Sequence, residues 1–187
     1  MNILTRQKGV ALIEVLVAFA VFSVGILGTF SMQIAAKRVN NDAAQQSVAT
    51  ALTRDIFARM RVNSSALDAY VVDDTGDEIE QDVDDCSSSV CSKLQMAARD
   101  IYEWTESLNG EQEHVLIDGN DIASAGLVDA RACIKNDAGI VSVSISWRSL
   151  NGVIGASTDP CEVRVLAENS PDEKFSALTM TSYVVQP

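Results

Sequence analysis

The feature that most constrains this chain is a long apolar segment directly after a short basic stretch near the N-terminus. Residues 10–32 (VALIEVLVAFAVFSVGILGTFSM) are predominantly apolar, and Arg6 and Lys8 precede them. At a rise of 1.5 Å per residue, a helix of this length spans the hydrocarbon core of a bilayer. Glu14 is the one charged residue in the segment. A carboxylate in an apolar span is costly, so such a residue indicates a functional role and a cationic partner.

Residues 8–18 (KGVALIEVLVA) resemble the class III signal of type IV pilins and pseudopilins. The resemblance implies that prepilin peptidase cleaves between Gly9 and Val10 and that the new N-terminus at Val10 is methylated. Most members of this family carry phenylalanine at the place of Val10. Because the cut precedes the apolar segment, the helix is retained, whereas a secretory signal peptide is removed with its apolar region. A plain signal anchor with an incidental glutamate is the alternative interpretation.

Cleavage would also supply a partner for Glu14. The new α-amino group of an adjacent subunit is the cation that we expect Glu14 to contact. Burying such a pair desolvates both charges, so its expected role is to set the axial register between subunits rather than to add stability. The resemblance implies that the partners of the N-terminal helix are other minor pilins and the major pilin, in addition to prepilin peptidase and the inner membrane.

Charge indicates an exported domain that does not bind nucleic acid. The chain has 14 basic and 26 acidic side chains, and removal of Arg6 and Lys8 with the leader leaves a net charge of about −14. Nucleic-acid binding relies on Lys and Arg that neutralise phosphates, so an acidic chain is a poor candidate. The basic leader is expected in the cytoplasm and the acidic bulk on the far side of the membrane, which in a Gram-negative cell is the periplasm.

The four cysteines, Cys86, Cys91, Cys133 and Cys161, fit an oxidising compartment. An even number in an exported domain favours disulfides, and three pairings are possible. We expect Cys86–Cys91 and Cys133–Cys161. A zinc site with four cysteines is the alternative, but the spacing lacks the repeated CxxC pairs typical of such sites. We predict no metal, no cofactor and no catalytic residue, since no nucleophile motif or phosphate loop is present and His114 lies in a polar turn.

A second helical segment follows the apolar one without a break. Val48, Leu52, Ile56 and Met60 recur every four residues, with Ala44 and Ala51 beside them, while charged residues occupy other faces. We therefore predict one helix over residues 10–63, whose transmembrane half covers 10–33 and whose amphipathic half covers 34–63. Gly25 and Gly28 within it are expected to allow close helix packing; local weakening of the helix is the alternative.

Residues 68–85 (DAYVVDDTGDEIEQDVDD) form an acidic run without a basic residue. A solvated loop is the expected structure of a charge run of one sign. Calcium binding is the alternative, because carboxylates supply the oxygen ligands that this ion takes, although the spacing is not that of an EF-hand.

The sequence pattern after residue 91 predicts a short helix followed by a sheet. Ser92 and Gln95 form a capping box that opens a helix over residues 92–108, and Asn109-Gly110 ends it. Tyr102 and Trp104 in this helix are expected to serve the core rather than a ligand. Strands are predicted at 130–135, 139–148, 161–167 and 175–185, with a turn at 136–139. The predicted class is α+β: a pilin fold, in which the long helix packs on an antiparallel sheet within a head spanning residues 64–187.

Three further segments narrow the resemblance to the PilV group of minor pilins: EVLVAFAVFSVGILG, the Cys86/Cys91 pair followed by DIYEWTESL, and VSVSISWR before Cys161. This resemblance implies a minor pilin that primes assembly of a type IV pilus and is incorporated at or near its tip. A minor pseudopilin of a type II secretion system and a tip adhesin are the alternatives. The implied location is the inner membrane with a periplasmic head before assembly, and the pilus on the cell surface afterwards.

Overall fold

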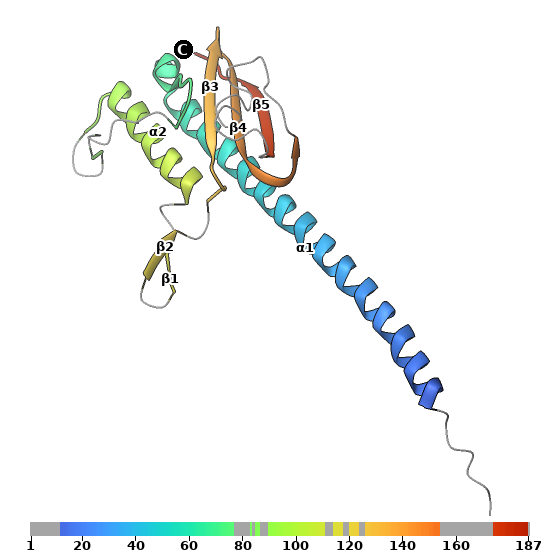
Figure 1. Ribbon diagram of the computed structural model, residues 1–187. Coiled ribbons are helices and arrows are strands. Elements are labelled where there is room, and N and C mark those ends of the chain that lie inside the picture. The colour runs from blue at the N-terminus through green and yellow to red at the C-terminus, as the bar shows by residue number, and fades with distance from the viewer. Residues whose placement is uncertain are drawn as a thin grey trace, which may run out of the picture. The chain divides into compact units, whose positions relative to one another are not determined.

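The computed structural model describes residues 12–76, 83, 85, 86, 90–110, 114–117, 120–123, 126–153 and 174–186 (Figure 1). In chain order its elements are α1 (Leu12–Val62), the 3₁₀ helix η1 (Ser64–Tyr70), α2 (Lys93–Asn109), β1 (His114–Ile117), β2 (Asn120–Ala123), β3 (Arg131–Asp137), β4 (Ile140–Val153) and β5 (Phe175–Tyr183). The chain divides into two units between Asn41 and Asp42, and each is described by itself. The α+β architecture predicted from the sequence is confirmed.

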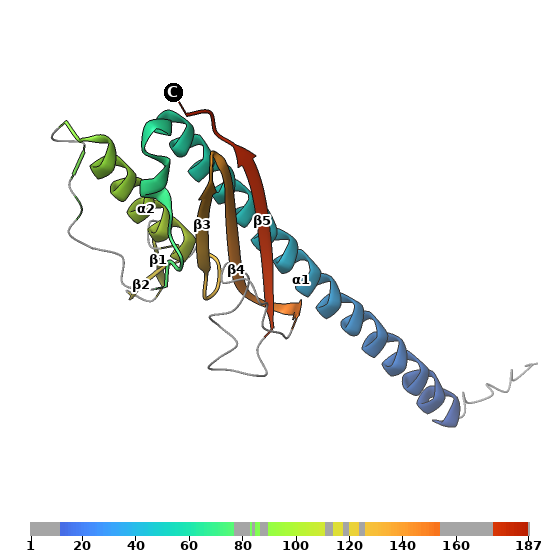
Figure 2. The same ribbon diagram turned by 90° about the horizontal axis from the view of Figure 1, so that it is seen from above.

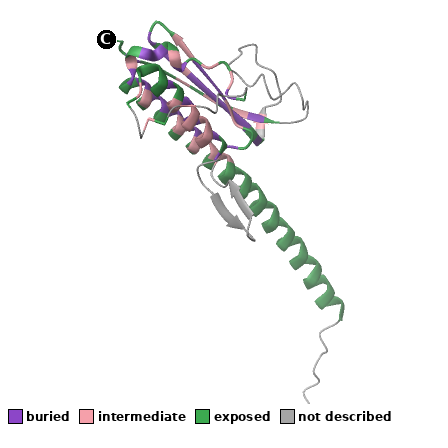
Figure 3. Ribbon diagram, turned by 90° about the vertical axis from the view of Figure 1, so that its left-hand side faces the viewer, coloured by how far each residue is buried: buried purple, intermediate pink, exposed green. Residues whose placement is uncertain are grey.

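The first unit contains the N-terminal part of α1. Every described residue from Leu12 to Asn41 is exposed within the chain (Figure 3). The helix is continuous through Gly25 and Gly28, and a Cβ placed on either glycine would meet no atom within 4 Å. The structure therefore leaves both glycines accessible, and their role in close helix packing stays a prediction.

The second unit is built around a three-stranded antiparallel sheet in the order β3-β4-β5, seen side by side in Figure 2. The C-terminal part of α1 packs on one face of this sheet. The shared core contains Ile56, Phe57 and Met60 of α1 and Val143 and Ile145 of β4, all of them buried. Alternation along β4 explains this arrangement, because successive side chains of a strand point to opposite faces.

The predicted four-stranded sheet is only partly matched. Three of the predicted strands are present as β3, β4 and β5, whereas residues 161–167 lie outside the described residues. The predicted turn between the first two strands is confirmed: Asp137 pairs with Ile140, and Ala138 and Gly139 between them both have positive φ, at 50° and 89°. Two such residues are the signature of the tight type I′ hairpin turn.

A second hairpin was not predicted. The segment β1 pairs with β2 in a separate two-stranded sheet, with His114 opposite Ala123 and Ile117 opposite Asn120. His114 thus begins a strand, and the expectation that it lies in a polar turn was wrong for its backbone. The sequence did hold a signal, because Asp118-Gly119 follows the apolar run 115–117 and is a typical hairpin dipeptide.

The predicted apolar stripe of α1 faces the core. Ile56 and Met60 are buried, and Val48 and Leu52 are partly buried and pack against the core. The flanking residues were predicted wrongly: Ala44 and Ala51 are exposed, whereas Ala49, Thr53 and Phe57 are buried. An α-helix has 3.6 residues per turn, so the buried face includes residues on both sides of a strict spacing of four.

Candidate functional site

The sites predicted at the N-terminus are only partly within the described residues. Gly9 and Val10 lie outside them, so cleavage at this bond and methylation of Val10 stay predictions. Glu14 lies in the first turn of α1 and is exposed. Among the described residues it has no ion pair and no side-chain hydrogen bond.

The surface around Glu14 is apolar on every side of the helix. Large apolar residues from Leu12, 77% exposed, to Met32, 76% exposed, stay uncovered by the rest of the chain. Burial of one such side chain is worth about 1.5–3 kcal/mol, so a dozen of them represent on the order of 20–40 kcal/mol. By length and composition α1 can cross a membrane, and this energy requires that lipid or other helices cover it.

The hydroxyl groups of this segment are satisfied inside the helix. Ser23 Oγ donates to the carbonyl of Phe19 at 2.7 Å, and Thr29 Oγ1 donates to that of Ile26 at 2.8 Å. Ser31 Oγ donates in the same way to Leu27, at 3.1 Å. Such back-bonded hydroxyls are compatible with an apolar environment. Glu14 is therefore the polar side chain of this segment that still needs a partner, and a single chain does not supply one among its described residues.

In the head, a polar cluster joins α1 to α2. Arg59 of α1 lies at its centre, with Nη1 2.9 Å from Asp100 Oδ1 and 3.0 Å from Glu103 Oε2, and with Nε 2.9 Å from Asp55 Oδ2. We call Arg59, Asp55, Asp100 and Glu103 the Arg59 cluster. Arg99 adds a contact to Glu103, with Nε 2.7 Å from Oε1. The i,i+4 pairs 55–59 and 99–103 are local and readable from the sequence, but the contacts between the two helices are not.

Arg59 and Glu103 of the Arg59 cluster are stabilised in their charged forms. Burial by itself lowers the pKa of Arg59, but hydrogen bonds to Glu103, Asp100 and Asp55 outweigh it and raise this pKa above its ordinary value. Burial likewise raises the pKa of Glu103, and the donors Arg99 and Arg59 outweigh it, so that this pKa is lowered. Paired charges with several hydrogen bonds resist loss of charge, and the cluster therefore holds α2 at a defined position on α1.

Tyr70 and Asn63 extend this contact to η1. The Tyr70 hydroxyl donates to Asp100 Oδ2 at 2.5 Å, and Asn63 Nδ2 donates to the Tyr70 hydroxyl at 3.3 Å and to the carbonyl of Lys93 at 2.7 Å. Tyr70 is fully buried. Burial and the bond to Asp100 raise the pKa of Tyr70 well above its ordinary value of 10. Residue 70 belongs to the predicted acidic loop, so its place in the core was not foreseen.

The described part of the acidic run, residues 68–76, is only partly solvated. Val72 forms an antiparallel bridge with Ile134, and Arg131 Nη1 lies 3.4 Å from Asp74 Oδ2. Asp68 and Asp73 are exposed, whereas Tyr70 and Thr75 are buried, so the solvated-loop prediction is matched in part. Residues 77–82 and 84 lie outside the described residues. Among the residues that are described, no group of three or more metal-ligating side chains gathers, and calcium binding by the run stays an open alternative.

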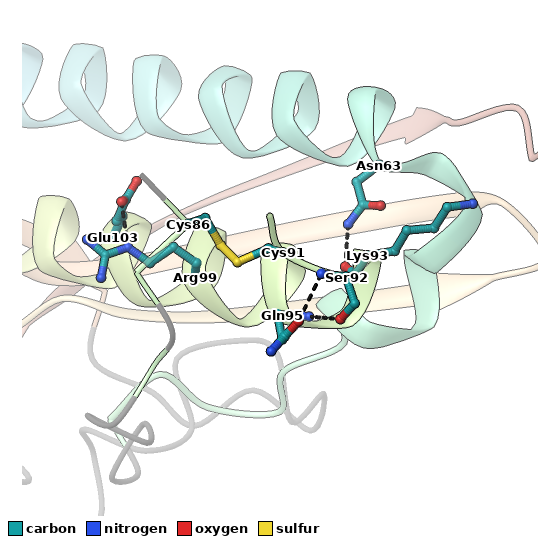
Figure 4. The surroundings of a disulfide bond; sticks show 8 residues. All are labelled: Asn63, Cys86, Cys91, Ser92, Lys93, Gln95, Arg99 and Glu103. Atoms are coloured by element: carbon teal, nitrogen blue, oxygen red, sulfur yellow. Dashed lines mark hydrogen bonds and ion pairs between the residues drawn. A yellow bond between two sulfur atoms is a disulfide. The ribbon is translucent and has the colours of Figure 1, made fainter. Parts of the chain in front are cut away.

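The Cys86–Cys91 disulfide is confirmed, and it lies immediately before α2 (Figure 4). The capping box that follows it is confirmed as well: Gln95 N donates to Ser92 Oγ at 3.3 Å, and Ser92 N donates to Gln95 Oε1 at 2.8 Å. Cys133 is buried and disulfide-bonded. Its expected partner, Cys161, lies outside the described residues, so that pairing stays a prediction.

Comparison with known proteins agrees with this geometry. Residues 31–102 match the family model Tt1218-like, described as type IV pilin Tt1218, and residues 4–30 match the model of the prokaryotic N-terminal methylation motif. No curated protein and no solved structure gave a match. Type IV pilins are structural proteins, and the methylation motif implies processing by prepilin peptidase and assembly with other pilins. The chain is therefore similar to the type IV pilins over residues 31–102, and residues 4–30 carry the N-terminal methylation motif.

Proposed function

We propose that this protein is a minor pilin of a type IV pilus, of the PilV group, that takes part in the complex priming pilus assembly at or near the tip. The observation that carries the proposal is Glu14. This carboxylate lies on the N-terminal part of α1, where the apolar side chains are exposed, and it has no partner among the described residues. A charge in this setting needs a cation from another chain. The methylated N-terminus of an adjacent subunit is the cation that we expect in this role.

The proposed sequence of events follows from the energy of the helix. Before assembly the apolar half of α1 stays in the inner membrane, because its exposure to water would be strongly unfavourable. The second unit, which begins at Asp42, lies on the periplasmic side. Contact with the helices of other minor pilins and of the major pilin replaces the lipid, and Glu14 sets the register of that contact. The assembled subunit is then part of the pilus at the cell surface.

The test removes the charge of Glu14 and keeps its size. In Glu14→Gln, we expect the helix to insert and the head to fold, while co-purification with other minor pilins and the number of pili per cell fall. Glu106→Gln is the matched control, because it removes one charge from the partly exposed surface of α2. Wild-type piliation in the Glu14→Gln strain, at normal protein level, would contradict the pairing. Loss of secretion with intact pili would instead assign the protein to a type II secretion system.

A further inference from the structure

The two edges of the three-stranded sheet differ in how they are covered. The edge of β3 is covered by the segment from Val72 to Thr75. Val72 N donates to Ile134 O at 3.1 Å, Ile134 N donates to Val72 O at 2.8 Å, and Thr75 N donates to Ala132 O at 2.9 Å. The opposite edge is formed by β5, and among the described residues no strand pairs with its outer side (Figure 2).

The hydrogen-bond pattern shows which backbone groups of β5 face outward. Arg148 N of β4 donates to Val128 O on the β3 side, and Ser149 N donates to Lys174 O on the β5 side. Odd-numbered residues of β4 therefore bond toward β5, where Val143 lies opposite Met180 and Ile145 opposite Leu178. The backbone groups of the alternate β5 residues point away from the sheet. These residues are Ala177, Thr179, Thr181 and Tyr183.

The composition of β5 does not protect this edge. Natural edge strands carry charged residues, proline or bulges that prevent pairing with another chain. The nine residues of β5 (FSALTMTSY) contain no charged residue, no proline and no glycine, although the chain as a whole carries a net charge of −12. An uncharged strip with high strand propensity on such an acidic protein indicates a surface that is covered in the working state.

The core is also incomplete at this edge. Val143 and Ile145 are fully buried, whereas Met180 and Leu178, which lie opposite them on the same face, are only partly buried. Among the described residues, none completes the burial of Met180 and Leu178. A further strand beside β5 would cover both side chains and would pair with the outward backbone groups.

We propose that the outer edge of β5 binds an extended, uncharged segment of a neighbouring pilin-like subunit, which adds a strand to the sheet. The proposal rests on the proposed function, which places other pilin helices beside α1. The strand β5 borders α1, since Arg61 Nη2 donates to Ser182 Oγ at 2.9 Å. A subunit that packs along α1 on the side of β5 would meet this edge. Main-chain pairing supplies affinity in this mode of binding, and the side chains beside Leu178 and Met180 supply specificity.

Antiparallel pairing of two β5 strands does not fit a second copy of this chain. Two strands that pair in this way are related by a two-fold axis perpendicular to the sheet. This axis would reverse the direction of α1, which lies against the sheet, in one of the two copies. Both copies then could not be anchored in the same membrane, and we therefore propose a different subunit as the occupant.

The test uses the full-length protein in the membranes of its own host. Ala177→Pro removes an outward N–H without breaking the pairing of β5 with β4, and Ala177→Val is the matched control that keeps the N–H. Thr181→Lys keeps the backbone N–H and instead places a charge at the edge, which disfavours pairing with another strand. We expect co-purification of other pilin-like subunits to fall about tenfold in Ala177→Pro and in Thr181→Lys, and to stay at the wild-type level in Ala177→Val. A photo-crosslinking amino acid in place of Ala177 should capture a different pilin-like subunit.

Other outcomes would overturn the proposal. Unchanged co-purification in both edge variants, with folding verified by thermal unfolding, would show that the edge binds nothing that matters for assembly. Crosslinks confined to residues 154–173 of the same chain, or to a second copy, would name a different occupant. Glu14→Gln in the same assay separates the two proposals. If it abolishes co-purification while Ala177→Pro and Thr181→Lys do not, the pilin function stands and the edge proposal fails.

Discussion

The hydroxyl group of Tyr70 donates a 2.5 Å hydrogen bond to the carboxylate of Asp100, and this contact ties η1 to α2. Asp100 also accepts a bond from Arg59 of α1. One carboxylate therefore joins three helical segments that are separate in the sequence. Hydrogen bonds to charged groups are stronger than those between neutral groups, so this carboxylate is a sensitive point of the head.

Replacement of Tyr70 by phenylalanine should destabilise the head by about 1.5–3 kcal/mol, because a buried bond to a charged group is lost while the ring is kept. Thermal unfolding of the detergent-solubilised protein measures this, with Tyr183→Phe as a control on an exposed ring. The folded-state pKa of Tyr70 is raised above its ordinary value of 10. The contribution of the protonated Tyr70 hydroxyl to the stability of the head is therefore complete below pH 10, and it is lost as the pH rises through the folded-state pKa. Equal alkaline sensitivity of wild type and Tyr70→Phe would contradict this assignment.

Acid should weaken the contacts of Glu103 with Arg59 and Arg99. The pKa of Glu103 is lowered in the folded state from its ordinary value of 4.5. Its stabilising contribution is therefore present above that value and is lost as the pH falls below it. Glu103→Gln should be less stable than wild type at neutral pH and should lose less stability on acidification. Denaturant unfolding as a function of pH tests this, and Glu106→Gln should follow the wild-type curve.

The turn between β3 and β4 offers a stabilising substitution. Ala138 has a φ of 50°, a left-handed conformation that alanine adopts at a cost. Asn followed by glycine is the preferred pair in this turn. We expect Ala138→Asn to stabilise the protein by about 0.5–1 kcal/mol, which raises Tm by about 1–4 °C. Ala138→Val should lower Tm, because a β-branched residue tolerates this conformation less well than alanine. A higher Tm in the valine variant would be inconsistent with the turn.

The Cys86–Cys91 disulfide should stabilise mainly the beginning of α2. The bond closes a short loop, with a sequence separation of 5, for which the chain-entropy model gives about 2 kcal/mol. In Cys86→Ser/Cys91→Ser we expect a loss of this size in denaturant unfolding. Hydrogen exchange should become faster at Lys93 to Met96 and stay unchanged in β4. Equal acceleration in both elements would show that the bond acts on the whole head.

Processing at the N-terminus is tested by mass spectrometry of the mature protein. We expect an N-terminus at Val10 that carries a methyl group. Gly9→Phe should retain the leader, because a bulky side chain then replaces glycine at the junction, whereas Val10→Phe should be cleaved normally. Intact protein beginning at Met1, from cells with active prepilin peptidase, would argue against the pilin interpretation itself.

Features that depend on residues a few positions apart were predictable from the sequence. The long helix follows from continuous helical periodicity, the start of α2 from Ser92 and Gln95, and its end from Gly110, which adopts the left-handed conformation. The turn at Ala138 and Gly139 was also located correctly. Each of these signals involves backbone groups within about one turn of the chain, so the local residues decide the outcome.

Other features were decided only by the tertiary structure. The sequence shows that α1 has an apolar face, but packing against β4 decides that Phe57 is buried and Ala51 exposed. Arg59, Tyr70 and Asp100 are far apart in the chain and meet because three segments pack together. The outer edge of β5, which no strand among the described residues covers, likewise exists only in the assembled sheet. Sequence periodicity specifies which surfaces need burial, while the partner of each surface depends on long-range packing that no local pattern encodes.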